Sequence, residues 1–336
     1  MRRALLLQPA WWAVVGTAWS IPGGRVPIGF YGYDIADPPC NLLRNSTLPP
    51  SPAPDCKGPA GPPIGWRTNE AFWRDYSAAG FTTILWEYVC PPIHDAAAHL
   101  SAPACHRRHP PEPSTGLSSG RYETREGFSA GLDFLQGELG LPIFPILGVQ
   151  NNIEFSNAMP NHTAARAQAT ALAQLFKSDP RIFGYSTLDE PSGAPDWPLD
   201  LYHAMKAEDG ERPVLLNIGS DGWPALNVTA PIVKAADIAT IDPYVDYRKD
   251  PADDWQEQDP YNSNSVRVVA KALDFLRTAI DATSSGNKPG QVMAVLGTLP
   301  RVPEPSAFRP ATAAEARAEA FLAVNHGASG LLYWQG

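Results

Sequence analysis

The sequence predicts a single (β/α)8 barrel, an α/β fold of the TIM type. Short apolar runs alternate with longer segments of helical periodicity, which is the pattern of parallel strands joined by crossover helices. Eight such runs and seven such segments can be counted, and eight strands fit a closed barrel better than an open doubly wound sheet. The stretch Gly29-Phe30-Tyr31-Gly32 lacks the G-x-G-x-x-G spacing of a dinucleotide-binding sheet, so an open sheet of that kind is disfavoured.

The predicted elements alternate along the chain. Strands are expected over 27–35, 81–89, 141–149, 182–190, 213–218, 238–244, 291–299 and 331–334. Helices are expected over 69–79, 125–139, 164–177, 199–207, 225–235, 266–282 and 312–327. Gly140 is a good helix stop, and Thr312 with Glu315 forms a capping box, whereas the helical signal within 225–235 is weak. Because Gly336 directly follows the last strand, the eighth helix, which would cover the seam between strands eight and one, is missing from this prediction.

The first 20 residues are predicted to form a secretory signal peptide, which leaves 21–336 as the barrel domain. Met1-Arg2-Arg3 precedes an apolar stretch, and Ala18-Trp19-Ser20 is a small-x-small cleavage site. A short anchor helix is the alternative, although Pro9 and the short length disfavour a span of about 20 residues. No later segment is long and apolar enough to cross a bilayer, and the net charge of -9 argues against nucleic acid as a partner.

Four cysteines and three sequons are consistent with an oxidising secretory compartment, so the protein is expected to be secreted or to reside in a secretory lumen. Cys40 and Cys56 follow the first predicted strand, and Cys90 and Cys105 follow the second. Pairing within each loop would fasten that loop over the barrel mouth, and pairing between the loops stays open. The N-glycosylation sequons begin at Asn45, Asn161 and Asn227.

Polar side chains stand at the predicted carboxyl ends of the strands, where a barrel of this kind builds its active site. They are Asp34, Glu87, Gln150, Asp189, Glu190, Asn217, Asp242, Tyr244 and Trp334. The fourth strand stops at Asp189-Glu190-Pro191, because proline has no N–H to continue a ladder. Each buried polar group must find a partner, so their number at one end of the barrel favours a site over simple packing.

Three stretches, 182–191, 236–244 and 326–334, resemble clan A glycoside hydrolases, in particular poorly characterised β-galactosidase-like members. The resemblance implies that Glu190 is the general acid/base and that Tyr244 and Trp334 contact the sugar. It also implies a nucleophilic glutamate at the end of strand seven, where this sequence has no carboxylate. Glu304, in the loop after that strand, and Asp242 are the candidates for the second catalytic group.

Three mechanisms stay open. A retaining reaction needs two carboxyl groups about 5 Å apart, and an inverting reaction needs roughly 6.5 to 9.5 Å. The third is substrate assistance, as in β-hexosaminidases, where Asp189 would orient an acetamido group and Glu190 would protonate the leaving oxygen. In any of these mechanisms, Asp34, Glu87, Asp189 and Asn217 are predicted to contribute to substrate binding.

The sequence therefore predicts a secreted glycoside hydrolase with a carbohydrate substrate, and the alternative is a catalytically silent barrel that binds carbohydrate or protein. Structural roles are also open for several of these residues, such as a turn at Asp242-Pro243, a solvated loop at Glu304 or barrel packing by Trp334. No cofactor is predicted, since neither a P-loop nor a G-x-S-x-G elbow is present. No metal is predicted either, because the histidines match no compact ligand pattern: these are His94, His99, His106 and His109. The sequence gives no indication of oligomeric state.

Overall fold

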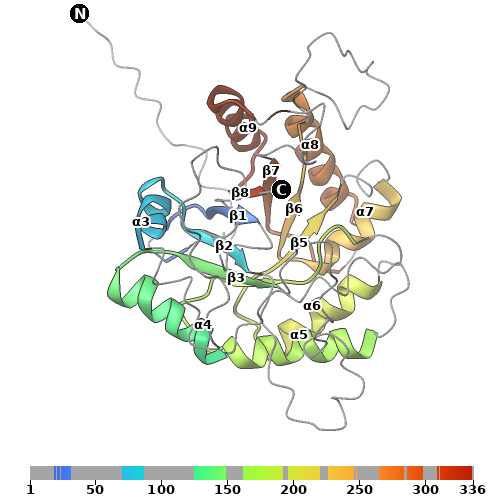
Figure 1. The fold of residues 1–336 in the computed structure, drawn as a ribbon. Coiled ribbons are helices and arrows are strands. Elements are labelled where there is room, and N and C mark those ends of the chain that lie inside the picture. Colours follow the sequence, from blue (N-terminus) through green and yellow to red (C-terminus); the bar gives the residue numbers. More distant parts are fainter. Residues whose placement is uncertain are drawn as a thin grey trace, which may run out of the picture.

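The structure, a computed structural model, describes residues 19, 21–22, 24–31, 70–86, 125–148, 162–191, 196–219, 226–245, 247, 265–283, 286–297, 309 and 311–334. Within these residues, eight parallel strands close a barrel in sequence order, from β1 to β8 (Figure 1). The helices lie around the outside of the strands (Figure 1). The predicted (β/α)8 fold class is confirmed.

The strands are β1 Ile28–Tyr31, β2 Thr83–Trp86, β3 Phe144–Gly148, β4 Gly184–Ser186, β5 Val214–Ile218, β6 Ile238–Ile241, β7 Gln291–Gly297 and β8 Gly330–Trp334. The helices are α3 Glu70–Ala78, α4 Arg125–Leu132, η3 Asp133–Glu138, α5 His162–Phe176, α6 Asp196–Glu208, α7 Leu226–Ile232, η5 Val233–Ala235, α8 Arg267–Asp281 and α9 Ala313–Asn325. Each predicted strand and helix therefore has a counterpart. The strands, as defined by their hydrogen bonds, are shorter than the apolar runs that predicted them. The difference is clearest at β4, where the residues on either side of Gly184–Ser186 are also buried.

The helix signals in the sequence acted as expected at two helix ends, whereas two helices begin earlier than predicted. Gly140 has φ 63°, the left-handed conformation that ends a helix, and Thr312 and Glu315 form the reciprocal capping box of α9. Helices were expected from residues 164 and 199, but α5 begins at His162 and α6 at Asp196. Pro198 lies in the first turn of α6, where its missing N–H has no intrahelical partner to lose.

Aromatic side chains lie across the outside of the seam between β8 and β1. The two strands pair over four residues, from Ile28 with Leu331 to Tyr31 with Trp334. Tyr76 of α3 stacks on Phe81 with ring centroids 4.7 Å apart, and Phe81 meets Tyr333 of β8 edge-on at 6.0 Å. Among the described residues no helix follows β8, so in this part of the chain α3 and these rings cover the seam.

One apolar cluster fills the interior of the barrel. It consists of Ile21, Leu85, Ile146, Phe183, Leu215, Ile238, Met293, Val295 and Leu332. Ile21 is fully buried, and the preceding Trp19 offers its carbonyl to Gln291 Nε2 at 3.1 Å. Lys206 Nζ lies 5.5 Å from the centre of the Trp19 ring. The segment before β1 thus packs against the amino-terminal end of the barrel.

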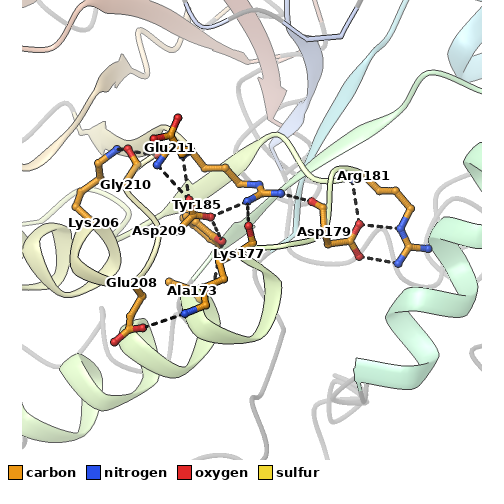
Figure 2. A network of polar contacts seen from close by, with 11 residues as sticks. Ala173, Lys177, Asp179, Arg181, Tyr185, Lys206, Glu208, Asp209, Gly210 and Glu211 are labelled. Carbon is orange, nitrogen blue, oxygen red and sulfur yellow. Dashed lines mark hydrogen bonds and ion pairs between the residues drawn. The ribbon is translucent and has the colours of Figure 1, made fainter.

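A polar network at the base of the barrel fastens β4 to its neighbours (Figure 2). The Tyr185 hydroxyl donates to Asp209 Oδ2 at 2.8 Å, and Arg212 Nη1 donates to the same oxygen at 2.7 Å. Arg212 also donates to the carbonyls of Lys177 and Asp179. Burial opposes ionisation of Asp209, but the hydrogen bonds from Tyr185 and Arg212 lower the pKa of its carboxyl. The network therefore joins β4, the end of α5 and the turn that leads into β5.

Several predicted residues lie outside the described part of the chain. These are the four cysteines and the four loop histidines, Asp34, Glu87, Gln150 and Glu304, the sequons at Asn45 and Asn161, and the signal region apart from Trp19. The third sequon lies in α7, where Asn227 is exposed and Thr229 is buried. No described helix has the length and the apolar character that a bilayer span requires.

Candidate active site

The carboxyl ends of β4, β5, β6 and β8 bring together six of the predicted site residues. These are Asp189, Glu190, Asn217, Asp242, Tyr244 and Trp334. Side chains alternate along a strand, so Leu215 and Asn217 of β5 both face the barrel interior. Leu215 belongs to the apolar cluster, whereas Asn217, two residues further on, begins a polar layer. The candidate site is this polar layer above the apolar interior.

Asn217 is the centre of the layer and links three strands. Its Nδ2 donates to Asp189 Oδ1 at 2.8 Å and to Asp242 Oδ2 at 3.4 Å. Its Oδ1 accepts from Thr240 Oγ1 at 2.8 Å. Only 1% of Asn217 is exposed, so these bonds satisfy an amide that has no access to water. Asn217 therefore holds the two aspartates beside each other.

Glu190 has an unusual backbone that directs its side chain across β5. Its φ is 45°, and it is the one non-glycine residue with positive φ among the described residues. Its N–H donates to the Asn217 carbonyl at 3.1 Å, which fixes this turn. The left-handed conformation costs an L-residue about 1–2 kcal/mol. Strain of this kind is concentrated at functional sites, where it directs a side chain into the place that its role requires.

Gly219 provides the space that the Glu190 side chain occupies. A Cβ at position 219 would lie 2.5 Å from Glu190 Cγ and 2.6 Å from Glu190 Cδ. Real Cβ atoms do not approach other carbons so closely, so only glycine fits beneath Glu190 at the end of β5. Gly219 was not among the predicted site residues. The signal that could have identified it is its position two residues after Asn217, on the inward-facing side of the strand.

Asp242 directly follows β6 and is 1% exposed. Burial raises the pKa of its carboxyl well above the usual range, as do a hydrogen bond with Glu190 and the negative charges of Glu190 and Asp189. Asp242 Oδ1 accepts no hydrogen bond from the described donors. Burial and the neighbouring negative charges therefore favour the neutral, protonated form of this carboxyl.

Two aromatic rings form the wall of the layer beside β7 and β8. The ring centroids of Tyr244 and Trp334 are 5.2 Å apart at an angle of 42°. Both rings pack against the apolar interior and both keep a partly exposed surface. A Cβ at Gly297, the last residue of β7, would lie 3.1 Å from Tyr244 Cδ1. Burial, followed by the negative charges of the three neighbouring carboxyl groups, raises the pKa of the Tyr244 hydroxyl well above its usual value.

The end of β7 therefore carries Gly297 beside Tyr244, and Glu304 of the following loop lies outside the described residues. In the described part of the chain, no group of three or more histidine, cysteine or acidic side chains is arranged to hold a metal ion. The site that the structure describes consists of three carboxyl groups, one amide, one hydroxyl and two aromatic rings.

Comparison with known proteins identifies the fold. No protein-family model matches the sequence, and no curated protein matches it either. Among solved structures, a candidate alpha-L-fucosidase from Bacteroides thetaiotaomicron matches with a TM-score of 0.55 at 11% identity, over 94% of this chain and 87% of that chain. A GH2 beta-galacturonidase from Eisenbergiella tayi, bound to galacturonate, matches with a TM-score of 0.53 at 15% identity, over 93% of this chain and 44% of that chain.

A beta-galactosidase from the psychrophilic Marinomonas ef1 matches with a TM-score of 0.50 at 11% identity, over 79% of this chain and 52% of that chain. The chain thus spans about half the length of the beta-galacturonidase and of the beta-galactosidase. At such low identity, these matches show that the chain shares the barrel fold of glycoside hydrolases. The fold that the resemblance implies is confirmed.

Proposed function

We propose that this protein is a secreted glycoside hydrolase in which Glu190 acts as the general acid/base. The observation that carries the proposal is the position of Glu190 at the carboxyl end of β4, beside a buried carboxyl and facing a layer of polar and aromatic side chains. Solved structures with the same fold include proteins named for the hydrolysis of galacturonides and galactosides. These neighbours support carbohydrate as the substrate class.

The chemistry of the site fits proton transfer to a glycosidic oxygen. Three carboxyl groups lie close together, and like charges at short range favour keeping a proton on at least one of them. A group that holds a proton near neutral pH can deliver it as a glycosidic bond breaks. Tyr244 and Trp334 offer apolar ring surface on which a sugar can lie.

We assign the role of the second catalytic carboxyl group to Glu304, in the loop after β7. A retaining mechanism needs carboxyl groups about 5 Å apart and an inverting one roughly 6.5 to 9.5 Å, so that a sugar or a water fits between them. Asp242 lies within hydrogen-bonding reach of Glu190, so the two carboxyl groups are too close for a sugar or a water to fit between them. Asp34 and Glu87, predicted at the ends of the first two strands, would contact the substrate.

A catalytically silent barrel that binds carbohydrate or protein is the second candidate. The observation that favours it is Gly297 at the end of β7, where the resemblance implies a nucleophilic glutamate. Such a protein would keep the aromatic wall and the polar layer but would break no bond.

The test is a panel of 4-nitrophenyl glycosides and polysaccharides, assayed with the native protein, with Glu190→Gln and with Glu211→Gln. Glu211 is an exposed residue in the turn before β5, so its variant is the matched control. We expect Glu190→Gln to lose about 10²–10⁴-fold in kcat/KM and the control to retain the native value, because general acid catalysis contributes that much. Native rates in Glu190→Gln would contradict the role of Glu190. Glycan binding without hydrolysis by the native protein would favour the silent barrel.

A further inference from the structure

We infer that Asp242 and Glu190 form a pair of carboxyl groups that holds one proton, that Asp242 carries this proton in the free protein, and that Asp242 supplies it to Glu190. Asp242 is thereby a positioning residue, which acts through Glu190 and does not touch the substrate. The inference rests on the proposed role of Glu190 as the general acid/base.

The first observation is the path of the Glu190 side chain. The positive φ of Glu190 and the absence of a side chain at Gly219 let it cross the end of β5. Its carboxyl then comes within hydrogen-bonding reach of the carboxyl of Asp242, which follows β6. Carboxylate oxygens are acceptors only, so two carboxyl groups can form a hydrogen bond only when one of them is protonated. A hydrogen bond between Glu190 and Asp242 therefore requires a shared proton.

The second observation is the supply of donors around Asp242. Asn217 Nδ2 donates to Oδ2 of Asp242, and the Tyr244 hydroxyl also lies within hydrogen-bonding reach of this carboxyl, but Oδ1 accepts nothing from the described donors. An ionised carboxylate with 1% exposure and an unsatisfied oxygen would be costly, because a buried charge needs a partner. A protonated carboxyl at Asp242 avoids this cost and provides the donor that the Glu190 contact needs.

The third observation is where the negative charge of the pair can be solvated. Glu190 is partly exposed, whereas Asp242 is buried. The charge is therefore more stable on Glu190 and the proton more stable on Asp242.

The other groups around Asp242 do not alter this assignment. The charged groups at the end of β4 that act on Asp242 are Glu190 and Asp189. Their negative charge disfavours a further negative charge on Asp242. From β5 and β6 it is faced by the amide of Asn217 and the hydroxyl of Tyr244, which are uncharged at neutral pH. The end of β7 contributes Gly297, which has no side chain.

Substrate binding would then release the proton to the reaction. A sugar over Glu190 excludes water and removes the solvation that favoured the charge there, so the Asp242 proton moves to the Glu190 carboxylate. Glu190 gives this proton to the glycosidic oxygen as the carbon–oxygen bond breaks. Water adds its oxygen to the anomeric carbon and releases one proton to solvent, and the pair takes one proton back. The sum of these steps is hydrolysis, with no proton gained or lost.

The direct test is carbon-13 NMR of protein labelled at the aspartate and glutamate side-chain carboxyls, titrated between about pH 4 and pH 8. We expect one aspartate carboxyl to stay protonated through neutral pH, and its resonance to be missing in Asp242→Asn. In Glu190→Gln the same carboxyl should titrate at lower pH, because the hydrogen bond and the neighbouring charge are gone while the burial remains. If every aspartate carboxyl of the native protein titrated near the ordinary aspartate pKa, the inference would be overturned, and this result relies on no variant that has to fold.

The second test is the pH dependence of kcat/KM on a glycoside that the native protein cleaves. Asp242→Asn keeps the size and the neutral charge of the residue but has no proton to give. We expect its activity on the alkaline side to be lost at a pH at least about one unit lower than in the native protein, with smaller losses on the acidic side. An equal loss at every pH would indicate a merely structural role and would overturn the inference. Native activity in Glu190→Gln would instead refute the proposed function, while the NMR titration would still decide whether the pair exists.

Discussion

The carboxyl group of Glu190 lies directly over Gly219, so that a Cβ at position 219 would be 2.6 Å from Glu190 Cδ. The two residues lie 29 positions apart in the sequence. Their close approach nevertheless determines where the side chain of Glu190 can go. In this position the Glu190 carboxyl comes within hydrogen-bonding reach of Asp242.

Gly219→Ala should displace Glu190 and break its contact with Asp242. We expect kcat/KM to fall at least about tenfold while the protein stays folded, because the strain can be relieved by moving one side chain at a strand end. The control is Gly290→Ala before β7, where a Cβ would meet nothing within 4 Å, and this variant should keep native activity. Kinetics and thermal unfolding of both variants provide the measurement. Native kinetics in Gly219→Ala would show that the position of Glu190 is not set by this contact.

Asn217→Ala should destabilise the protein and loosen both aspartates. The substitution removes the donor to Asp189 and Asp242 and leaves the Thr240 hydroxyl without its acceptor on Asn217. Because the site is buried, we expect the free energy of unfolding to fall by about 1–3 kcal/mol. Asn325→Ala, at the exposed end of α9, is the matched control and should change the stability by less than about 0.5 kcal/mol. Urea unfolding measures both, and equal values for the two variants would contradict the central role of Asn217.

Arg212→Met should destabilise the protein more than loss of an exposed ion pair would. Asp209 is buried, and Arg212 is its ion-pair partner as well as a donor to the carbonyls of Lys177 and Asp179. Removing the cation leaves a buried carboxylate, which costs about 3–5 kcal/mol. Arg166→Met, which breaks the exposed pair with Asp200, should cost at most about 1 kcal/mol. Guanidinium unfolding of both variants checks the difference, and similar losses would show that the network at the base of β4 adds little.

Glu319 should make stability depend on pH around neutrality. It is 1% exposed and accepts a hydrogen bond from the Tyr247 hydroxyl at 2.5 Å, and burial raises the pKa of its carboxyl to about 7. The folded state then binds more protons than the unfolded state between about pH 4.5 and pH 7, so the contribution to stability is complete below that range and falls as pH rises through it.

The variant Glu319→Gln keeps an acceptor for Tyr247 but cannot titrate. Relative to the native protein, it should gain stability between about pH 4.5 and pH 7, by about 3 kcal/mol in total. Glu315 serves as the control, because its pKa is shifted in the opposite direction. The hydrogen bond from Arg309 lowers the pKa of the Glu315 carboxyl to about 2. Its stabilising effect is present above about pH 4.5 and is lost as pH falls toward 2, so Glu315→Gln should show no gain at neutral pH. Urea unfolding at several pH values measures both, and a constant difference between native protein and Glu319→Gln would refute the prediction.

The sequence by itself determined the order and type of the elements and the strand ends on which the candidate site stands. Alternating apolar runs and helical periods are local signals, and so are the capping box at Thr312 and the helix stop at Gly140. The same local pattern placed Glu190 at the end of the fourth strand and Asp242 at the end of the sixth. These features follow from neighbouring residues, so they could be read without the fold.

Only the tertiary structure decided which of these residues meet. Closing eight parallel strands in register sets the end of β5 between the ends of β4 and β6, so that Gly219 lies beneath Glu190 and Asn217 binds both aspartates. Closure also places Tyr333 against Phe81 across the seam and buries Ile21 at the base. Such contacts join residues from distant parts of the sequence. Whether a glycine leaves room for a neighbouring side chain, as Gly219 does, or allows a turn of the backbone depends on which residues pack against it in the fold. The environment of each carboxyl, and therefore its protonation, is a property of the closed barrel.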